Sequence, residues 1–418
     1  MRFSVASVVA VISLLAVACG DEGPASPSTG DEDITSNHAD IVELEWEGEV
    51  IARAGEPAKQ ALVTQLQYLS GHLSADGDAG AQTRLAQLLE AKETPSANGT
   101  KKIAYRAAVP VAWPKSSRAP ATYPLVLPRD VSALARFNAK YDGACGESHY
   151  GQDRFWYDYN PRAAGCRFDD ADVLRANATV RPHPGTTQGR YPEYDKVWAD
   201  GRLDVLMVNG IIGDDNRSDE SYREVDTILS SLAGSLESTP EKKEAAATPS
   251  IRRDVTLTGK LRGGRTVSVR ALNVREVETS GRDFDTVYGP ASAKADVIVY
   301  SGHSGLGRHI KSLLSRMEVE KDRYQLLYLY GCNTLEYVSP DIYERKSASN
   351  GSADPIGTKF LDVISTARPA YGDNGRSTLA IVRAMIDAKQ SYNDLLARDF
   401  SSSHLTVVFG EEDNTFEP

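Results

Sequence analysis

Two short apolar runs in this sequence each end beside a residue type that takes part in nucleophilic catalysis. The first run ends at Gly302-His303 within DVIVYSGHSGLG, and the second ends at Gly331-Cys332 within YQLLYLYGCNT. A thiolate attacks carbonyl carbons, and a neighbouring imidazole takes the thiol proton and returns it to the leaving amine. We therefore predict that His303 acts as a general base and acid and that Cys332 acts as the nucleophile.

The two runs have the length and composition of strands that are buried on both faces of a sheet. If they are neighbouring parallel strands, their carboxyl ends meet at the edge where open α/β sheets bind ligands. Glycines allow tight turns and close approach of a substrate backbone, and backbone N–H groups at such turns are able to stabilise an oxyanion. We expect Gly302, Gly305 and Gly331 to line this site, and a family resemblance given below implies the same of Ser304.

The second half of the chain, from about Leu203, alternates apolar runs with amphipathic runs. This alternation predicts a mostly parallel sheet flanked by helices over residues 201–418. The expected strands are LDVLMVNG, ADVIVYSG, QLLYLYG and LTVVFG, and a hairpin is expected in RRDVTLTGKLRGGRTVSVRAL. The expected helices are one that follows an amino cap at Ser218, one over about 306–317, PIGTKFLDVISTA, and RSTLAIVRAMIDAKQSYNDLLARDF. The charged stretch ESTPEKKEAAATPS is expected to be a mobile insertion.

The region before the α/β unit divides into two parts by its pattern. Residues 43–102 predict a helical region, with an antiparallel helical pair in PAKQALVTQLQYLSGHL and AQTRLAQLLEA. Residues 103–200 predict an aromatic, β-rich accessory domain interrupted by one helix at about 131–141. DRFWYDYN alternates as a half-buried strand would. His72, His149 and His183 have no partners at metal-ligand spacing, and no metal or cofactor is expected.

The amino terminus has the layout of an export signal. Residues 1–18 predict a signal peptide, too short and wrongly flanked for a resident membrane helix. Ala16, Val17 and Ala18 before Cys19 resemble the bacterial lipobox, which implies lipidation of Cys19; secretion without a lipid is the alternative. Residues 19–42 begin as an acidic stretch rich in Gly, Pro and Ser, which predicts a flexible tether. We expect an exported protein, lipid-anchored to the bacterial cell envelope at the periplasm or outer surface.

Cysteine usage and net charge narrow the function further. In an oxidising compartment, two of the three cysteines after Cys19 should pair, and Cys145 and Cys166 lie in one local segment. A Cys145–Cys166 disulfide would leave Cys332 as the single free thiol. The formal net charge is -11, so a basic surface for nucleic acid is not expected.

The two apolar blocks also carry a family resemblance. A strand ending in SGHSGLG followed by one ending in GCNT resembles the caspase-fold cysteine peptidases of clan CD, which include caspases, gingipains, clostripain and the bacterial CHAT domains. In that family a hydrophobic block precedes His-Gly, and a second precedes Ala-Cys or Gly-Cys. VVFGEEDN near the end of the chain is similar to the family's terminal strand motif. The likeness covers about residues 203–414, and Ser304 stands where the family usually has glycine.

The resemblance implies a fold, an activity and a substrate class. It implies an α/β protein with a caspase-like, mostly parallel sheet flanked by helices, to which the N-terminal helical pair and the aromatic β-rich domain would be added. It implies a cysteine endopeptidase that hydrolyses a protein or peptide substrate through a His303–Cys332 dyad and a thioester intermediate, without a cofactor. YERKSASNGSADP lies where caspases carry a cleaved linker, which suggests self-cleavage near Arg345 or Lys346.

Two other functions stay open at this point. GHSG resembles the nucleophile elbow of a serine α/β-hydrolase, with Ser304 followed in order by Asp373 and His404. The elbow needs glycine where Leu306 stands, and His404 precedes the last apolar strand rather than following it. A non-catalytic caspase-fold lipoprotein that acts as a binding module is the second alternative.

Overall fold

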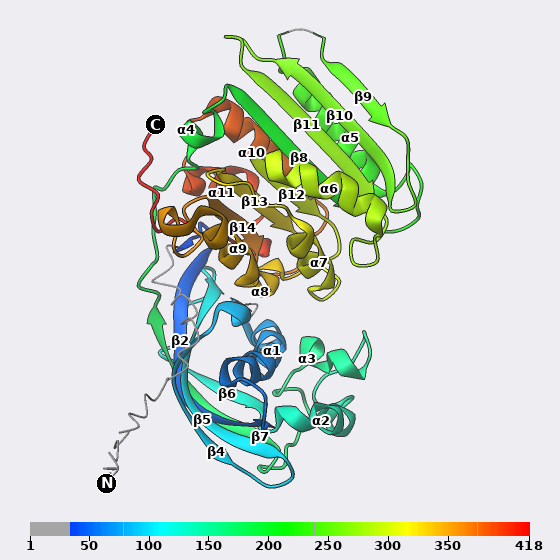
Figure 1. The fold of residues 1–418 in the computed structure, drawn as a ribbon. Helices are drawn as coiled ribbons and strands as arrows, with labels where there is room; N and C mark the ends of the chain where they lie inside the picture. The colour runs from blue at the N-terminus through cyan, green and yellow to red at the C-terminus, as the bar shows by residue number, and fades with distance from the viewer. Residues whose placement is uncertain (1–33, 78, 238, 374) are drawn as a thin grey trace, which may run out of the picture.

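The computed structural model describes residues 34–77, 79–237, 239–373 and 375–418. These residues form two sheets with helices packed against them, which is a mixed α/β architecture (Figure 1). The expected signal peptide and Cys19 lie outside the described residues. Among the helices that are described, none combines the length and the apolar character needed to cross a membrane.

The larger sheet holds the two apolar runs at its centre. In the described part of the chain it has nine strands in the order β1-β15-β14-β13-β12-β8-β11-β10-β9. The strands are β1 (Ile34–Thr35), β8 (Arg202–Gly210), β9 (Glu241–Ala245), β10 (Ile251–Lys260), β11 (Thr266–Val274), β12 (Val297–Ser301), β13 (Gln325–Tyr330), β14 (Leu361–Thr366) and β15 (Thr406–Phe409). The neighbours from β11 to β14 pair in parallel, whereas β1, β15, β10 and β9 pair antiparallel. The sheet is therefore mixed rather than mostly parallel as expected, because antiparallel strands are added at both of its edges.

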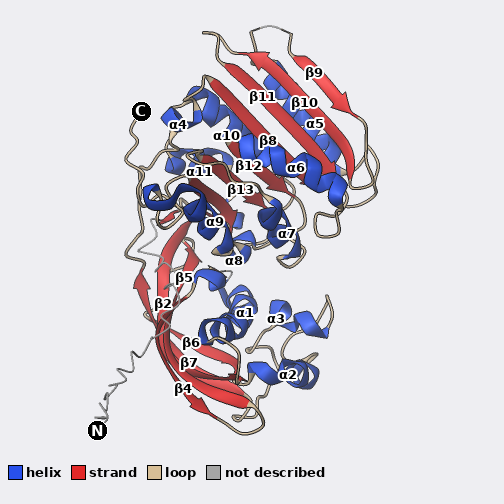
Figure 2. Cartoon of the chain, viewed as in Figure 1, coloured by secondary structure: helices blue, strands red, loops and turns tan. Residues whose placement is uncertain are grey.

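Both faces of this sheet are buried, which explains why its central strands are apolar without alternation. Along β13, Leu327 and Leu329 belong to one core cluster, and Tyr328 and Tyr330 belong to the other. One face is covered by α5 (Glu220–Ala233), α10 (Arg376–Asp387) and α11 (Tyr392–Asp399). The other face is covered by α6 (Arg282–Lys294), α7 (Arg308–Arg316), α8 (Thr334–Tyr337) and α9 (Asp341–Asn350). Figure 2 shows these helices in blue around the red strands.

The smaller sheet is antiparallel and curled, and it belongs to the N-terminal domain. Its longest strands, β2 (Ala39–Arg53) and β5 (Thr100–Pro114), pair along their full length. The other strands are β3 (Gly80–Ala81), β4 (Gln87–Pro95), β6 (Thr122–Pro128) and β7 (Val173–Pro182). Helix α1 (Ala58–Gly77) packs inside the curve, beside α2 (Leu134–Tyr141) and α3 (Phe155–Asp158) (Figure 1).

The predicted N-terminal helical pair is wrong in its second member. Only α1 forms; AQTRLAQLLEA instead supplies β3, a 3-10 turn and the start of β4. The residues before α1 form β2, where Leu44, Trp46 and Val50 are buried and Glu45 is less so. The apolar spacing of residues 81–91 suits a helix, but long-range pairing with β5 makes part of this segment a strand. Residues 43–102 and 103–182 therefore contribute strands to one sheet, and the expected tether already contains β1 and the start of β2.

Three further segments differ from the expected secondary structure. DRFWYDYN forms a 3-10 turn and the short helix α3 rather than a strand, inside a loop closed by a disulfide. In PIGTKFLDVISTA the β-branched residues form strand β14, buried between β13 and β15, rather than a helix. ESTPEKKEAAATPS contributes the exposed edge strand β9 rather than an irregular insertion.

The remaining elements of the α/β unit form where they were expected. Strands β8, β12, β13 and β15, the β10–β11 hairpin, and helices α5, α7, α10 and α11 are present. Asp219, one residue after the expected Ser218, caps α5 by accepting the Ser221 N–H. The helix expected at about 131–141 is α2 with a preceding 3-10 turn.

Candidate active site

The His303 turn and the Cys332 turn lie side by side at the carboxyl edge of the larger sheet. Strands β12 and β13 pair in parallel, with Ser301 opposite Tyr330. His303 and Cys332 each follow two residues beyond that pair, so they stand at the same level. The contact is close, because a Cβ placed on Gly331 would lie 2.6 Å from the Gly302 carbonyl oxygen and 3.6 Å from the Ser304 nitrogen. Glycine is therefore required at 331 for the two turns to meet.

The His303 turn is held by its own backbone carbonyl. That oxygen accepts hydrogen bonds from the Tyr300 hydroxyl at 2.5 Å and from His309 Nδ1 at 2.8 Å. The other ring nitrogen of His309, Nε2, lies 2.7 Å from the Glu276 carboxylate. The His303 imidazole itself is exposed to solvent. The backbone of His303 is therefore fixed while its side chain stays accessible.

The Cys332 turn is held by a buried network of hydroxyl groups. The Thr366 hydroxyl donates to the Gly331 carbonyl oxygen at 2.6 Å. The Thr334 hydroxyl lies 2.9 Å from that of Thr366 and donates to the Leu329 carbonyl oxygen at 2.8 Å. Thr334 and Thr366 are fully buried. The turn that carries the thiol is therefore attached to both β13 and β14.

The Cys332 thiol is half-buried, and it is the free cysteine among the described residues. Burial raises its pKa above the usual value, because a thiolate is poorly solvated there, and the nearby Ala370 N–H acts in the opposite direction. The thiol therefore stays protonated at neutral pH and needs a base to react. Within the described residues, no hydrogen bond joins the Cys332 thiol to the His303 imidazole, and catalytic hydrogen bonds often tighten only when substrate binds.

Backbone donors for an oxyanion are present on both turns. In the described part of the chain, neither the Ser304 N–H nor the Cys332 N–H donates a hydrogen bond. The Ser304 carbonyl, by contrast, accepts from Gly307 N at 3.1 Å and from His309 N at 3.2 Å, which holds the turn in shape. Both N–H groups are therefore available to donate to an oxygen that develops negative charge beside the thiol.

Two buried carboxyl groups support the edge of the sheet and were missed in the sequence. Glu224 on α5 accepts the Ser301 hydroxyl at 2.9 Å, and burial raises its pKa to about 7. Glu336 on α8, four residues after Cys332, has its pKa raised to about 8 by burial, against the smaller effects of Ser70 and Arg84. Ser70 and Arg84 belong to the N-terminal domain, so this domain packs directly against the helix that follows the thiol.

The three residues considered for a serine α/β-hydrolase are not joined into a catalytic triad. Ser304 is 3% exposed, and no hydrogen bond among the described residues joins Ser304, Asp373 and His404. Asp373 instead accepts from the backbone N–H and hydroxyl of Ser377. His404 packs edge-on against Tyr330, with ring centroids 5.6 Å apart, and burial lowers its pKa.

The remaining residues singled out in the sequence occupy structural positions. Cys145 and Cys166 form the expected disulfide, with their Cα atoms 4.8 Å apart. His149 Nδ1 lies 3.3 Å from Asp158, whereas His72 and His183 are buried. Across the described residues, no group of three or more His, Cys, Asp or Glu side chains is arranged to hold a metal ion.

The segment suggested for self-cleavage is helical rather than an open loop. Arg345 and Lys346 lie in α9, and the ammonium group of Lys346, which is fully buried, donates to the Arg323 carbonyl oxygen at 2.8 Å. Burial lowers the Lys346 pKa to about 7. Peptidases act on extended chains, so cleavage here would first require α9 to unfold.

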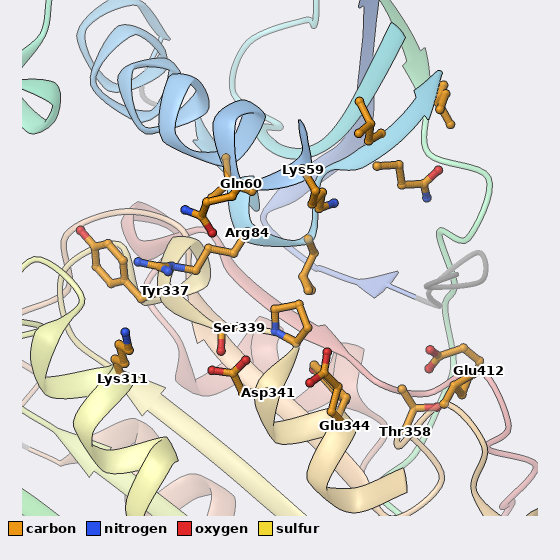
Figure 3. A pocket seen from close by; sticks show the side chains of 18 residues that line it. Lys59, Gln60, Arg84, Lys311, Tyr337, Ser339, Asp341, Glu344, Thr358 and Glu412 are labelled. Atoms are coloured by element: carbon orange, nitrogen blue, oxygen red, sulfur yellow. The ribbon is translucent and has the colours of Figure 1, made fainter. Parts of the chain in front are cut away.

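A large cavity lies between the two domains. It measures about 780 Å³ and is lined from the N-terminal side by residues that include Lys59, Gln60 and Arg84. From the other side its lining includes Lys311, Tyr337 and Asp341 (Figure 3). Neither His303 nor Cys332 lines this cavity. Tyr337, at the end of α8, is the link between the cavity and the helix that follows Cys332.

The closest contacts and the electrostatics thus describe a thiol and an imidazole on adjoining turns, with two unused N–H donors between them. No model of a known protein family matches this chain, and no curated protein matches it.

Proposed function

We propose that this chain is a cysteine peptidase-like hydrolase of the caspase-fold type, with Cys332 as nucleophile and His303 as general base and acid. The observation that carries the proposal is the β12–β13 register, which brings the two turns level at one sheet edge. The order of the blocks, and the parallel pairing of the strands from β11 to β14 at the centre of a mixed sheet, support the resemblance seen in the sequence. The substrate is a protein or peptide, and no cofactor takes part.

The reaction follows from the groups at the two turns. Cys332 passes its proton to the His303 imidazole, and the sulfur bonds to the scissile carbonyl carbon. The N–H groups of Ser304 and Cys332 donate to the resulting oxyanion. As the carbon–nitrogen bond breaks, the imidazolium gives its proton to the leaving amine, and a thioester remains. Water then attacks the thioester carbon while His303 takes a proton from it. The carbon–sulfur bond breaks, the imidazolium returns the proton to the sulfur, and the carboxylic acid leaves while the Cys332 thiol is restored.

Alkylation by iodoacetamide tests the dyad directly. The full chain is treated across a pH series, and the modified residue is identified by peptide mapping. We expect modification of Cys332 whose rate near neutral pH falls about tenfold or more in His303→Ala, because the imidazole accepts the thiol proton. His149→Ala is the matched control, since this exposed histidine is paired with Asp158 in the N-terminal domain. Equal rates in His303→Ala and His149→Ala would contradict the dyad.

Turnover distinguishes the peptidase from the alternatives. Hydrolysis of a mixed peptide library, followed by mass spectrometry, should be lost in Cys332→Ala and retained in Ser304→Ala. Ester hydrolysis that is lost in Ser304→Ala but kept in Cys332→Ala would favour a serine hydrolase. His303-dependent alkylation without peptide hydrolysis, together with binding of a protein partner, would favour a binding module.

We also propose that the protein is exported and anchored by a lipid on Cys19. The support is the sequence of the amino terminus alone. In a bacterial host the unchanged chain should incorporate labelled palmitate and enter the detergent phase of a Triton X-114 separation, whereas Cys19→Ser should do neither. Identical labelling and partition of the two chains would contradict the anchor.

A further inference from the structure

A disulfide-closed loop of the N-terminal domain reaches the candidate active site. Cys145 and Cys166 enclose α3, which carries the half-buried Tyr157. The loop rests closely on α1, because a Cβ placed on Gly71 would lie 2.4 Å from the Trp156 carbonyl oxygen. It is also tied to α2, since the Asn138 side-chain amide donates to the Gln152 carbonyl oxygen at 2.7 Å. The position of α3 is therefore set by the domain.

Tyr157 interacts electrostatically with residues at the α8 end of the larger sheet. Its phenol lies close enough to Cys332 and Glu336 for their charges to interact, and Tyr337 interacts with both Tyr157 and Cys332 in the same way. Ser70, next to Gly71 on α1, lies beside the Glu336 carboxyl. In Figure 1, α3 and α1 lie on the side of the N-terminal domain that faces α7 and α8. The loop thus stands beside the thiol.

Exposed apolar side chains gather around the same edge. Among the described residues four large apolar side chains are exposed, and three of them lie on segments that lead to the two turns: Tyr150 at 54%, Ile212 at 42% and Tyr371 at 79%. The fourth, Leu89 at 42%, lines the cavity between the domains. Large exposed apolar groups that gather in one place mark binding surfaces more often than singly scattered ones do.

Each of the three residues is linked to the site through a neighbouring residue. The Tyr150 ring stands edge-on to Tyr157, with centroids 5.7 Å apart. Tyr371 follows Ala370, whose N–H lies beside the Cys332 sulfur. Ile212 follows β8, and the Gly210 Cα lies 3.1 Å from the position of a Cβ on Gly302, next to His303. The three residues come from three segments that meet at the turns.

We propose that the Cys145–Cys166 loop forms one wall of the substrate groove and that Tyr150, Ile212 and Tyr371 bind apolar side chains of an extended peptide on either side of the scissile bond. This inference rests on the proposed function and adds the substrate class: polypeptide segments that carry aromatic or aliphatic residues. The occupant is a peptide because the apolar groups are continuous with a thiol–imidazole pair whose chemistry acts on carbonyl groups.

The N-terminal domain then takes part in substrate recognition rather than only in attachment. An extended segment that passes the thiol would contact Tyr150 on one side and Tyr371 or Ile212 on the other. Contact with these side chains favours an apolar side chain of the peptide over a charged one, because a charged group loses part of its hydration when it is covered.

The test compares two probes of the same thiol in the full chain. The rate of alkylation by iodoacetamide measures the reactivity of the Cys332 thiol alone. The rate with a peptidyl chloromethyl ketone that has a phenylalanine beside the electrophile also depends on how well the groove binds the peptide. We expect the ratio of the peptidyl rate constant to the iodoacetamide rate constant to fall about tenfold in Tyr150→Ser and in Tyr371→Ser. Leu89→Ser, which removes an equally exposed apolar side chain at the other cavity, should keep the ratio of the unchanged chain. Equal ratios in all three variants would overturn the groove.

A binding measurement separates the groove from the chemistry. In Cys332→Ala, fluorescence anisotropy with a labelled Phe-containing peptide should show binding that Tyr371→Ser weakens about tenfold and Leu89→Ser does not. His303-independent alkylation combined with this selective loss would sink the proposed function but support the groove. Equal peptide binding in the two variants would contradict the proposed groove, whatever the alkylation rates are. Conversion of a dimer to a monomer by Tyr371→Ser, without an effect on peptide binding, would also overturn it, by making the patch a contact between copies.

Discussion

The two turns of the candidate site are supported by different chemistry. The His303 backbone is held by Tyr300 and by His309, whose ring reaches the half-exposed Glu276 carboxylate, and the imidazole is exposed. The Gly331-Cys332 turn is held by the buried hydroxyls of Thr334 and Thr366. The difference teaches that the nucleophile side is fixed by neutral groups out of water, whereas the base side depends on the ion pair of His309 with the half-exposed Glu276. We expect changes on the Cys332 side to act mainly on stability and changes on the His303 side to act mainly on rate.

The largest effect is expected where the two sides touch. Gly331→Ala would put a Cβ 2.6 Å from the Gly302 carbonyl oxygen, and backbone must move to relieve that clash. We expect a loss of about 3 kcal/mol in the free energy of unfolding, together with loss of His303-dependent alkylation. Urea denaturation and iodoacetamide kinetics measure the two. Gly55→Ala is the control, because a Cβ at Gly55 meets nothing within 4 Å.

Glu336 is the exception on the Cys332 side, because it titrates. Its folded pKa of about 8 lies above the ordinary glutamate pKa of 4.5, so between these two pH values the folded state holds a proton that the unfolded chain releases. The stability that this proton contributes is complete below about pH 4.5 and is lost as pH rises towards about 8. At about 1.4 kcal/mol per pKa unit the upper limit is about 5 kcal/mol.

Glu336→Gln should remove this pH dependence. The variant should be more stable than the unchanged chain above about pH 8, and the two should converge below about pH 4.5. Thermal unfolding across pH measures the difference, and Glu241→Gln on the exposed strand β9 is the control. If the difference between Glu336→Gln and the unchanged chain did not vary with pH, the raised pKa would be wrong.

Thr366→Val tests the neutral hydroxyl network that holds the Cys332 turn. The change keeps the shape of the side chain but removes the hydroxyl that donates to the Gly331 carbonyl oxygen and contacts Thr334. Leaving these buried groups without a partner should lower the free energy of unfolding by about 2 kcal/mol. Thr64→Val, at an exposed hydroxyl on α1, should change it by less than about 0.5 kcal/mol. Equal losses in the two variants would show that the network does not support the turn.

His309→Gln should have the smallest effect on stability and a distinct effect on rate. The ring that donates to the His303 carbonyl oxygen and reaches Glu276 is lost, so the imidazole turn loosens. We expect the His303-dependent alkylation rate to fall about threefold and its pH profile to shift, because His303 is less well positioned. His309→Asn provides a shorter replacement. A change in stability without any change in the pH profile would assign His309 a purely structural role.

The pattern of apolar residues predicted strands β12 and β13 correctly but not strands β14 and β4. Strands β12 and β13 are continuous apolar runs bounded by glycine, and that pattern survives in the structure because both faces are buried. Strand β14 and strand β4 were assigned to helices, because their residue spacing also suits a helix. Pairing with distant strands decided those segments, and a single sequence carries no record of that pairing.

The reactive pair was visible in the sequence, but its supports were not. His303 and Cys332 follow glycines at strand ends, which is a local signal. Thr366 contributes to the Cys332 turn from a neighbouring strand that was assigned to a helix, so its contact with Gly331 could not be foreseen. His309 lies within the expected helix after the first block and carries no mark that its ring turns back to the His303 carbonyl.

The pairing of β1 with β15 has a consequence for how the chain folds. Ile34 stands opposite Phe409, so the first described strand and the last one are neighbours in the larger sheet. The whole N-terminal domain is inserted between β1 and β8, and the sheet can close its edge only when nearly the entire chain is present. Such a contact between opposite ends is costly in loop entropy and forms late in folding. A partly made or C-terminally shortened chain would leave the buried strand β14 as an open edge, ready to pair with another chain.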